Sequence, residues 1–285
     1  EKVDVTVAKA TSYFPSNRSL AVESGRFTIP STYAKPLMAD LDLFVSGSAD
    51  TIAEMANFKP INALKDTTFK PEDFRGNVKA QVNATFGLLS SQNPPHPAWA
   101  ASLTLDNVSL AKPFANRQVA DLNGALNIDN NVLRLQGNGK VDDVAMDINL
   151  IEPLRDSSKI AREFSLKAVI GNDQIAKFAP GLGSVVSGPI TMQLDGKGET
   201  DQTIRLDLTK SSLTVPGIGW SKGPGVKADA TFHMLSDQGR VSIRDFELKG
   251  DGFGARGNLE LAQGGLVSAD FSHMKLSASD DYAVQ

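Results

Sequence analysis

Three glycines, Gly252, Gly254 and Gly257, give this chain one match to the G-x-G-x-x-G pattern that binds dinucleotides. That chemistry requires a strand that turns into a helix, because the helix N-terminus holds the pyrophosphate. Here the residues that follow, Asn258–Leu261, alternate between polar and apolar and predict a strand instead. The context required for cofactor binding is therefore missing, and we interpret the motif as a glycine-rich turn between two strands.

The other residues that could do chemistry are scattered. The histidines His96, His233 and His273 are far apart in the sequence, and no pair has metal-ligand spacing. The chain has no cysteine, which excludes disulfides, thiol catalysis and cysteine-based zinc sites. No G-x-S-x-G nucleophile motif is present, and the acidic residues fall in turns or on polar strand faces. We therefore expect no catalytic residue, metal or cofactor, and a chain that is not an enzyme.

The composition sets further limits on function. The 285 residues are 41% hydrophobic and 22% charged, which is typical of a folded chain rather than a disordered one. The net charge of -4 is spread without basic blocks, so nucleic acid is not expected as a partner. No apolar run reaches the roughly 18 residues of a membrane-spanning helix. Alternation already begins at Val3, so we expect a fragment of a longer protein, with any membrane anchor outside it.

The dominant pattern of the chain is alternation of apolar and polar residues. Leu122, Leu126 and Ile128 fall on one face of a strand, and Asn123 and Asn127 fall on the other. Stretches of this kind recur along the chain, each ended by Gly, Asn or Asp, and the clearest runs from Val78 to Leu88. The sequence therefore predicts a mainly β protein with a long, curved antiparallel sheet, apolar on one side and solvated on the other.

Two segments change to helical spacing. Ser48–Phe58 carries apolar residues three and four apart, with Ser48 or Asp50 as the expected N-cap. Asn172–Ala179 is the second short helix, and Pro180 and Gly181 end it. Only these two segments are available to cover the apolar face of the sheet, which is little for about a dozen strands.

An internal repeat is also expected. Leu122–Leu150 reads strand, turn, strand, turn, strand, and Val226–Leu261 reads strand, turn, two short strands, turn, strand. Each predicted helix is followed by a glycine and a long strand. We expect two modules, residues 1–100 with the first helix and residues 101–285 with the second, stacked into an elongated repeat.

One segment, Ser212–Lys222, stands apart from the alternating strands. Pro216, Gly217 and Gly219 predict a turn, and Trp220 is one of only two tryptophans. The simplest interpretation is a corner filled by the indole. The functional alternative is that Trp220 lines the entrance of a groove, since tryptophan is amphipathic.

The chain resembles the AsmA-like superfamily of bacterial envelope proteins, most closely its large YhdP-type members. The resemblance rests on Ser46–Met55 (strand, glycine, short helix), Phe74–Val82 (glycine entering a long strand), Leu213–Lys222 and Gly225–Ala228. It covers most of the chain, although the expected N-terminal membrane helix is missing. The resemblance implies a periplasmic protein anchored in the inner membrane, whose sheet curls into a taco-like groove that carries phospholipids toward the outer membrane.

On this hypothesis the apolar face contacts phospholipid acyl chains. The inner membrane, reached through the absent helix, and other envelope proteins are the further partners. The candidate groove residues are Leu103, Leu105, Leu126, Ile128, Met146, Ile148, Leu206, Leu208, Phe232, Phe246 and Trp220. A charge placed in the groove, as in Ile148→Asp, is expected to abolish transport and leave the fold intact.

Two rival classes remain open. A structural or adhesive β-sandwich or β-solenoid would use the whole apolar face for its own core and bind no lipid. A polysaccharide-acting β-helix enzyme would need clustered carboxylates or aromatic residues on one face, and neither is found in the sequence. A groove and a sandwich differ in whether contiguous apolar surface stays open.

Overall fold

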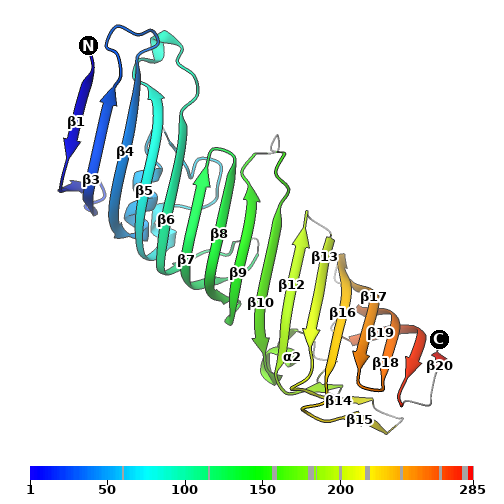
Figure 1. Cartoon of the computed structure of the whole chain (residues 1–285). Helices are drawn as coiled ribbons and strands as arrows, with labels where there is room; N and C mark the ends of the chain where they lie inside the picture. The colour runs from blue at the N-terminus through cyan, green and yellow to red at the C-terminus, as the bar shows by residue number, and fades with distance from the viewer. Residues whose placement is uncertain are drawn as a thin grey trace. The chain divides into compact units, whose positions relative to one another are not determined.

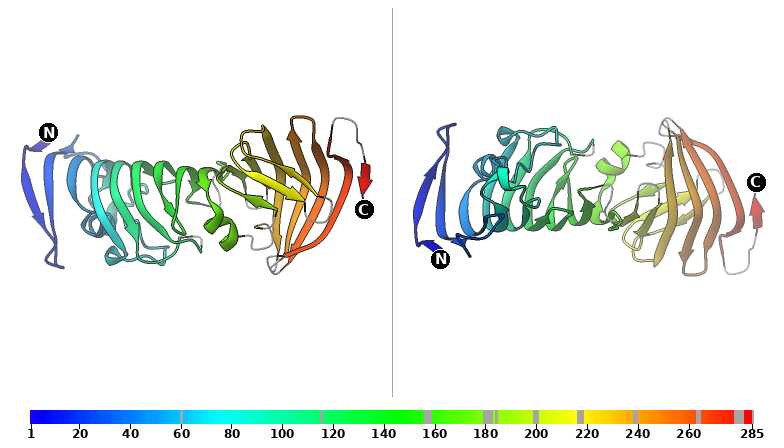
Figure 2. Two further views of the ribbon diagram at one scale, coloured as in Figure 1. Left: turned by 90° about the horizontal axis from the view of Figure 1, so that it is seen from below. Right: turned by 90° about the horizontal axis from the view of Figure 1, so that it is seen from above.

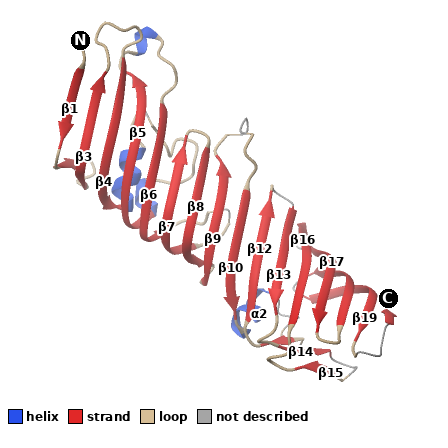
Figure 3. Cartoon of the chain, viewed as in Figure 1, coloured by secondary structure: helices blue, strands red, loops and turns tan. Residues whose placement is uncertain are grey.

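The fold was taken from a computed structural model of the whole chain (Figures 1 and 3). It describes residues 1–59, 61–114, 116–155, 159–178, 183, 185–198, 201–215, 219–237, 240–262, 265–277 and 282–284. Of these described residues, 63% are in strands and 7% in helices, and they form a large antiparallel sheet that is not closed, together with two α-helices. The prediction of a mainly β protein with an open antiparallel sheet and two short helices is confirmed.

The chain divides into two compact units. Unit 1 comprises residues 1–143 and 148–160, and unit 2 comprises residues 144–147 and 161–285. The expected boundary at residue 100 does not coincide with this division. Residue 100 lies inside a strand, where Val82 pairs with Ala101 and Asn83 with Ala100, so unbroken strand pairing carries unit 1 past that point.

Unit 1 is a meander of antiparallel strands. The first two, β1 and β2, both pair with β3, and each later strand to β8 pairs with the one before it. Two short 3-10 helices, η1 (Pro71–Asp73) and η2 (Ser90–Gln92), precede β5 and β6. The strands are β1 (Val3–Val7), β2 (Ala10–Tyr13), β3 (Ser19–Ile29), β4 (Met38–Ser48), β5 (Phe74–Gly87), β6 (Ala98–Leu110), β7 (Val119–Asp129) and β8 (Val132–Val141), and β9 (Val144–Pro153) contributes residues to both units.

Strand β5 shows why the sheet has one apolar face. Val78, Ala80, Val82 and Ala84 are buried, whereas the residues between them are exposed. Successive side chains on a strand point to opposite faces, so a period of two in the sequence becomes two chemically different surfaces. The same alternation continues in register across the neighbouring strands, and the predicted alternating strand is confirmed.

Bulges interrupt the ladders at residues with positive φ. The β5–β6 register shifts beside Gly76, whose φ is 102°, and the β6–β7 register shifts beside Asn107, whose φ is 54°. The Asn107 amide donates to the side-chain oxygen of Asn123 on β7, at 2.9 Å. A bulge bends its strand and increases its twist, and in Figure 2 the unit 1 strands, cyan to green, are arcs rather than straight rods.

The helix α1 (Ala49–Ala56) follows β4 directly, as predicted. Ser48 is its N-cap residue, and Asn57 ends it slightly before the expected Phe58. Ile52 is buried, and the helix packs mainly against β5 and η1, with further contacts to β4. Arg18 also holds the helix in place, because its guanidinium donates to Asp50 at 2.7 Å and to Glu54 at 2.9 Å.

Unit 2 has a main sheet and a second layer. Its main sheet pairs β10, β12, β13, β16, β17, β18, β19 and β20 antiparallel in that order. A separate sheet of β11, β14 and β15, together with α2, forms the second layer. The elements are β10 (Glu163–Ile170), α2 (Asn172–Phe178), β11 (Val186–Ser187), β12 (Ile190–Lys197), β13 (Asp201–Asp207), β14 (Ser212–Val215), β15 (Trp220–Lys222), β16 (Ala228–Asp237), β17 (Arg240–Gly250), β18 (Gly254–Ala262), β19 (Gly265–Lys275) and β20 (Tyr282–Val284).

The prediction of two short strands around residues 241–248 is wrong, because β17 is one strand with a bulge. Its register shifts between Ile243 and Phe246, beside Asp245 with a φ of 52°. The backbone N–H of Asp245 donates to the side-chain oxygen of Asn258 on the next strand, at 3.1 Å. Unit 1 has the same device at Asn107, so the two units share local construction as well as strand pattern.

The helices agree with an internal repeat too. Ile52 in α1 and Ile175 in α2 occupy matching positions in the similar segments Asp50–Met55 and Asp173–Phe178, and both are 5% exposed. The glycines Gly76 and Gly188, which follow the helices, have φ values of 102° and 98°.

Candidate functional site

The candidate site is the apolar side of the sheet in unit 1. We define the unit 1 apolar face by two conditions. Its side chains belong to β4 to β8 and lie on the same side of the sheet as Val78 and Val82, and they are not fully buried. Leu103 pairs with Leu126, which pairs with Leu135, so three leucines form a row across three strands. The face includes Leu41, Leu43, Phe86, Trp99, Ala101, Leu103, Leu126, Ile128, Leu133 and Leu135.

Burial varies along the strands of this unit. Near the end where α1 packs, Val45, Val78 and Leu105 are at most 6% exposed. Farther along the same strands, Leu103 and Leu126 are only half-buried. The helix therefore covers one end of the apolar side. Farther along, the larger side chains stay partly exposed, whereas the smaller Val82 and Ala84 between them are 5% and 6% exposed.

The structure divides the predicted residues of unit 1 and β9 into two groups. Leu103, Leu126 and Ile128 lie together on the unit 1 apolar face, and Met146 on β9 is also half-buried. Leu105 and Ile148 are each 6% exposed, so the folded chain already removes them from solvent.

In unit 2 the chain covers much of its own apolar side. Leu208 is 4% exposed within a packed cluster, and Leu206, Phe246 and Trp220 pack against that cluster. Phe232 is half-buried, with its ring centroid 6.2 Å from that of Phe246. The buried cluster consists of Ile175, Ile190, Leu208, Leu213, Ala228 and Ala230.

The expectation that only two helices could cover the apolar side is wrong for unit 2. The strands β14 and β15 supply additional cover through Leu213 and Trp220. The reason is that the sequence predicts a turn in Ser212–Lys222, whereas Leu213–Val215 pairs antiparallel with Trp220–Lys222. Short strands of three or four residues carry too little periodicity to be recognised locally.

Trp220 fills a corner, as the simpler interpretation predicts. Its ring lies 5.0 Å from the Phe253 ring in an edge-to-face arrangement. Its Nε1–H donates to the Leu276 carbonyl oxygen at 2.8 Å. Both the apolar body and the polar edge of the indole are therefore engaged within unit 2.

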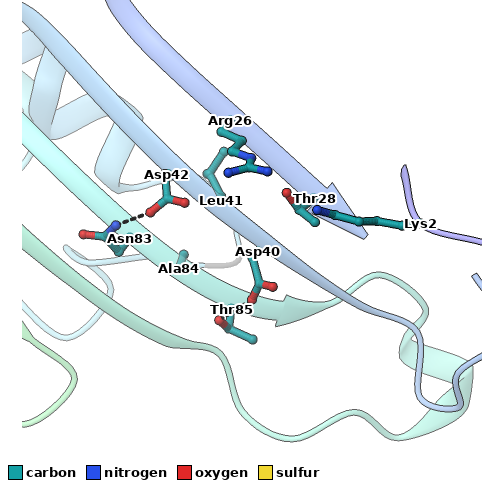
Figure 4. Close-up of a pocket in the computed structure, with 9 residues that line it drawn as sticks. All are labelled: Lys2, Arg26, Thr28, Asp40, Leu41, Asp42, Asn83, Ala84 and Thr85. Atoms are coloured by element: carbon teal, nitrogen blue, oxygen red, sulfur yellow. Dashed lines mark hydrogen bonds between the residues drawn. The ribbon is translucent and has the colours of Figure 1, made fainter. Parts of the chain in front are cut away.

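The polar side of unit 1 carries a shallow pocket of about 410 Å³ (Figure 4). Thr85 donates to Asp40 at 2.7 Å, and Asn83 donates to Asp42 on the neighbouring strand. The pocket is lined by Lys2, Arg26, Thr28, Asp40, Leu41, Asp42, Asn83, Ala84 and Thr85. These contacts form a ladder of cross-strand polar pairs, which stabilises a solvated sheet face. Alternating polar residues on predicted neighbouring strands are the sequence signal for such a ladder.

Asp4 adds charge beside this pocket. Hydrogen bonds from Arg26 and then Lys2 hold the pKa of the Asp4 carboxyl far below its usual range. Arg26 Nε donates to Asp4 Oδ1 at 2.9 Å, and Lys2 Nζ lies 3.2 Å from Asp4 Oδ2. These charges compensate one another at the surface, so they do not indicate an acid–base site.

The residues first considered for chemistry have structural positions. Gly252 lies in the turn between β17 and β18, whereas Gly254 and Gly257 belong to strand β18, so the interpretation of the motif as a turn is correct only at its start. A Cβ on Gly250 would lie 2.0 Å from the Phe253 ring, which explains a glycine beside this turn. His96 lies in the loop before β6, His233 in β16 and His273 in β19.

The described residues hold no cluster of metal-binding side chains and no membrane-spanning helix. No group of three or more His, Cys, Asp or Glu side chains in this part of the chain could hold a metal ion. Among the same described segments, no helix combines the length and apolar character needed to cross a membrane.

Sequence reasoning missed Lys222, which is 4% exposed. Its Nζ donates to the carbonyl oxygens of Leu208 and Ser211, the latter at 2.6 Å. Burial lowers the pKa of this ammonium group, and the charge of Asp207 opposes that shift. It lies in a segment that the sequence predicts as a turn, which gives no sign that it would be buried.

No protein-family model, curated protein or solved structure matches this chain. The AsmA-like resemblance therefore stays a prediction.

Proposed function

We propose that this chain is a non-enzymatic lipid-binding segment that holds acyl chains on the unit 1 apolar face. One observation carries the proposal: a row of half-buried apolar side chains, Leu103, Leu126 and Leu135, runs in register across three strands. The opposite face of the same strands is polar and exposed. A ligand that suits this surface has a long apolar part and a polar group at one end.

The dimensions of the face support an acyl chain. Strands lie about 4.8 Å apart, so the five strands β4 to β8 place their inward side chains over roughly 19 Å. One leaflet of a bilayer has a hydrocarbon depth of about 15 Å. Each methylene removed from water contributes about 0.8 kcal/mol, before the cost of ordering the ligand is subtracted. A chain of about that length lying across the strands could therefore contact about four of the five strands.

The cellular role we propose is phospholipid transport between the inner and outer membranes of a bacterial envelope. In that role the chain is a periplasmic segment of an AsmA-like protein, anchored to the inner membrane through a helix outside this sequence. Phospholipids, the inner membrane and other envelope proteins are its partners. This part of the proposal is supported by the resemblance in the sequence, whereas acyl-chain binding is supported by the geometry of unit 1.

Tryptophan fluorescence tests lipid binding at the site itself. Trp99 lies on the unit 1 apolar face, opposite Ala84, and the Trp220→Phe variant leaves it as the only tryptophan. We expect phosphatidylcholine brominated at mid-chain to quench Trp99, and native mass spectrometry to detect co-purified phospholipid. An unquenched Trp99 together with lipid-free protein would contradict the proposal.

The structural alternative has one specific observation in its favour. In unit 2 the cluster around Leu208 and Leu213 is filled by the chain itself, as expected for a self-contained β structure. If the same holds for unit 1 in solution, an aspartate at Leu126 will lower stability without changing any lipid signal. The two functions are thus separated by measuring stability and lipid binding on one variant.

A further inference from the structure

We propose that strands β14 and β15 form an internal plug that excludes acyl chains from the α2 end of unit 2. This inference rests on the proposed function and concerns where on the chain lipid can bind. The plug is defined as Ser212–Val215 and Trp220–Lys222. It takes the place, against the sheet, that an acyl chain takes on the unit 1 apolar face.

The main sheet does not need these strands for its continuity. Strand β13 pairs directly with β16, with Leu206 opposite Ala230. The Leu208 amide donates to the Ala228 carbonyl oxygen at 2.8 Å, closing the pair. A two-residue turn could connect strands paired in this way. Residues 209–227 are therefore an insertion at a hairpin, and the plug is part of that insertion.

The plug fills apolar volume over the sheet. Leu213 is 5% exposed and belongs to one cluster with Leu208, Ala228 and Ala230. Trp220 packs against the same cluster and stacks edge-to-face on Phe253. Apolar side chains thus hold the position that a bound hydrocarbon would need.

Polar contacts fasten the plug where a hydrocarbon could make none. Lys222 donates to the Leu208 and Ser211 carbonyl oxygens, and Trp220 donates to the Leu276 carbonyl oxygen. The Ser211 hydroxyl donates to the Pro189 carbonyl oxygen at 2.8 Å. A buried carbonyl oxygen without a donor is costly, so displacing the plug by lipid would lose these bonds as well as apolar contacts.

Unit 1 provides the contrast. Within its described residues no second sheet lies on the main one, and Leu103, Leu126 and Leu135 stay half-buried. The two units share the helix, the following glycine and the bulge device, but only unit 2 has the inserted strands. We infer that the shared module is open in unit 1 and closed by its own chain in unit 2.

The two native tryptophans make the first test. Trp220→Phe leaves Trp99 on the unit 1 apolar face, and Trp99→Phe leaves Trp220 in the plug. With phosphatidylcholine brominated at mid-chain as the quencher, we expect several-fold stronger quenching of Trp99 than of Trp220. Equal quenching of the two tryptophans would overturn the plug. Failure to quench Trp99 would instead count against lipid binding in unit 1.

The second test removes the plug. The reporter is Phe246→Trp, which packs against the cluster, in a chain that also carries Trp99→Phe and Trp220→Phe. One version keeps residues 209–227, and the other joins Leu208 to Ala228 by an Asn-Gly turn. We expect the brominated lipid to quench the reporter several-fold more strongly after removal of the insertion. Equal quenching with and without the insertion overturns the proposal. If the shortened chain does not fold, the comparison of Trp99 with Trp220 in the full-length chains decides it.

Discussion

Leu126→Asp is the sharpest perturbation of the unit 1 apolar face. Leu126 is half-buried between Leu103 and Leu135 on the neighbouring strands, so a carboxylate there can still reach solvent in the unliganded protein. We expect the free energy of unfolding to fall by about 1–2 kcal/mol, part of the 1.5–3 kcal/mol for burying a whole leucine. That loss is small beside a typical stability of roughly 5–15 kcal/mol, so the fold should persist.

Lipid binding should respond far more strongly. An acyl chain crossing Leu126 would lose contact for about three methylenes, worth ~2.4 kcal/mol or roughly 60-fold in Kd. The measurement is a titration with brominated phosphatidylcholine, read from Trp99 in the Trp220→Phe background, beside urea unfolding of the same proteins. Ala125→Asp is the matched control, because Ala125 is exposed on the opposite face of the same strand. Its Kd and unfolding midpoint should be nearly unchanged.

The sequence predicts that Ile148→Asp abolishes transport and leaves the fold intact, but the structure does not support this distinction. Ile148 is 6% exposed, and an unpaired carboxylate at a buried position costs several kcal/mol in addition to the lost apolar contacts. We expect this variant to unfold whether or not the protein binds lipid. The reasoning is refuted if Leu126→Asp binds lipid as tightly as the parent, or if Ala125→Asp loses binding to the same extent.

Two further predictions concern stability. Gly76→Ala should destabilise by roughly 1–3 kcal/mol in urea unfolding, because Gly76 has a φ of 102° and a Cβ would lie 2.3 Å from the Asn107 carbonyl oxygen. Gly223→Ala, where a Cβ meets nothing within 4 Å, is the control, and equal effects would refute the strain argument. Asp73 accepts hydrogen bonds from Lys112 Nζ at 2.7 Å and from a backbone amide at 2.8 Å, which lower the pKa of its carboxyl below 3.8. The stability that the Asp73 carboxylate contributes is present above the pKa of the unfolded chain and is lost as the pH falls through the lower pKa of the folded protein. Asp73→Asn should therefore weaken the acid dependence of the free energy of unfolding, and an unchanged pH profile would contradict this.

The strand pattern of the fold could be predicted because it is written in neighbouring residues. The apolar residues from Val78 to Ala84 alternate with polar ones, and the apolar ones are buried on one face of the sheet as that alternation requires. The α1 helix was predictable for the same reason, since Ile52 and its neighbours repeat at helical spacing. Strand β17 was read as two strands because Asp245 breaks the period, and a bulge of this kind is recognised only from the partner strand.

The candidate site could be predicted only in part. Alternation places Leu103, Leu105 and Leu126 on one face, but it cannot separate the buried Leu105 from the half-buried others. That distinction depends on tertiary packing near one end of the strands, where α1 lies against β5 and β4. Lys222 was missed for a related reason, since the carbonyl oxygens that surround it belong to a turn eleven to fourteen residues earlier.

The sequence alone determined that this chain is a mainly β protein with one apolar side, because successive side chains of a strand point to opposite faces of the sheet. It also excluded cysteine chemistry, because the residue type is absent. Only the tertiary structure decided which part of the apolar side stays accessible. Cover is supplied by segments distant along the chain, such as α1 over β4 and β5 or Leu213 over Leu208, and burial depends on that packing rather than on local period.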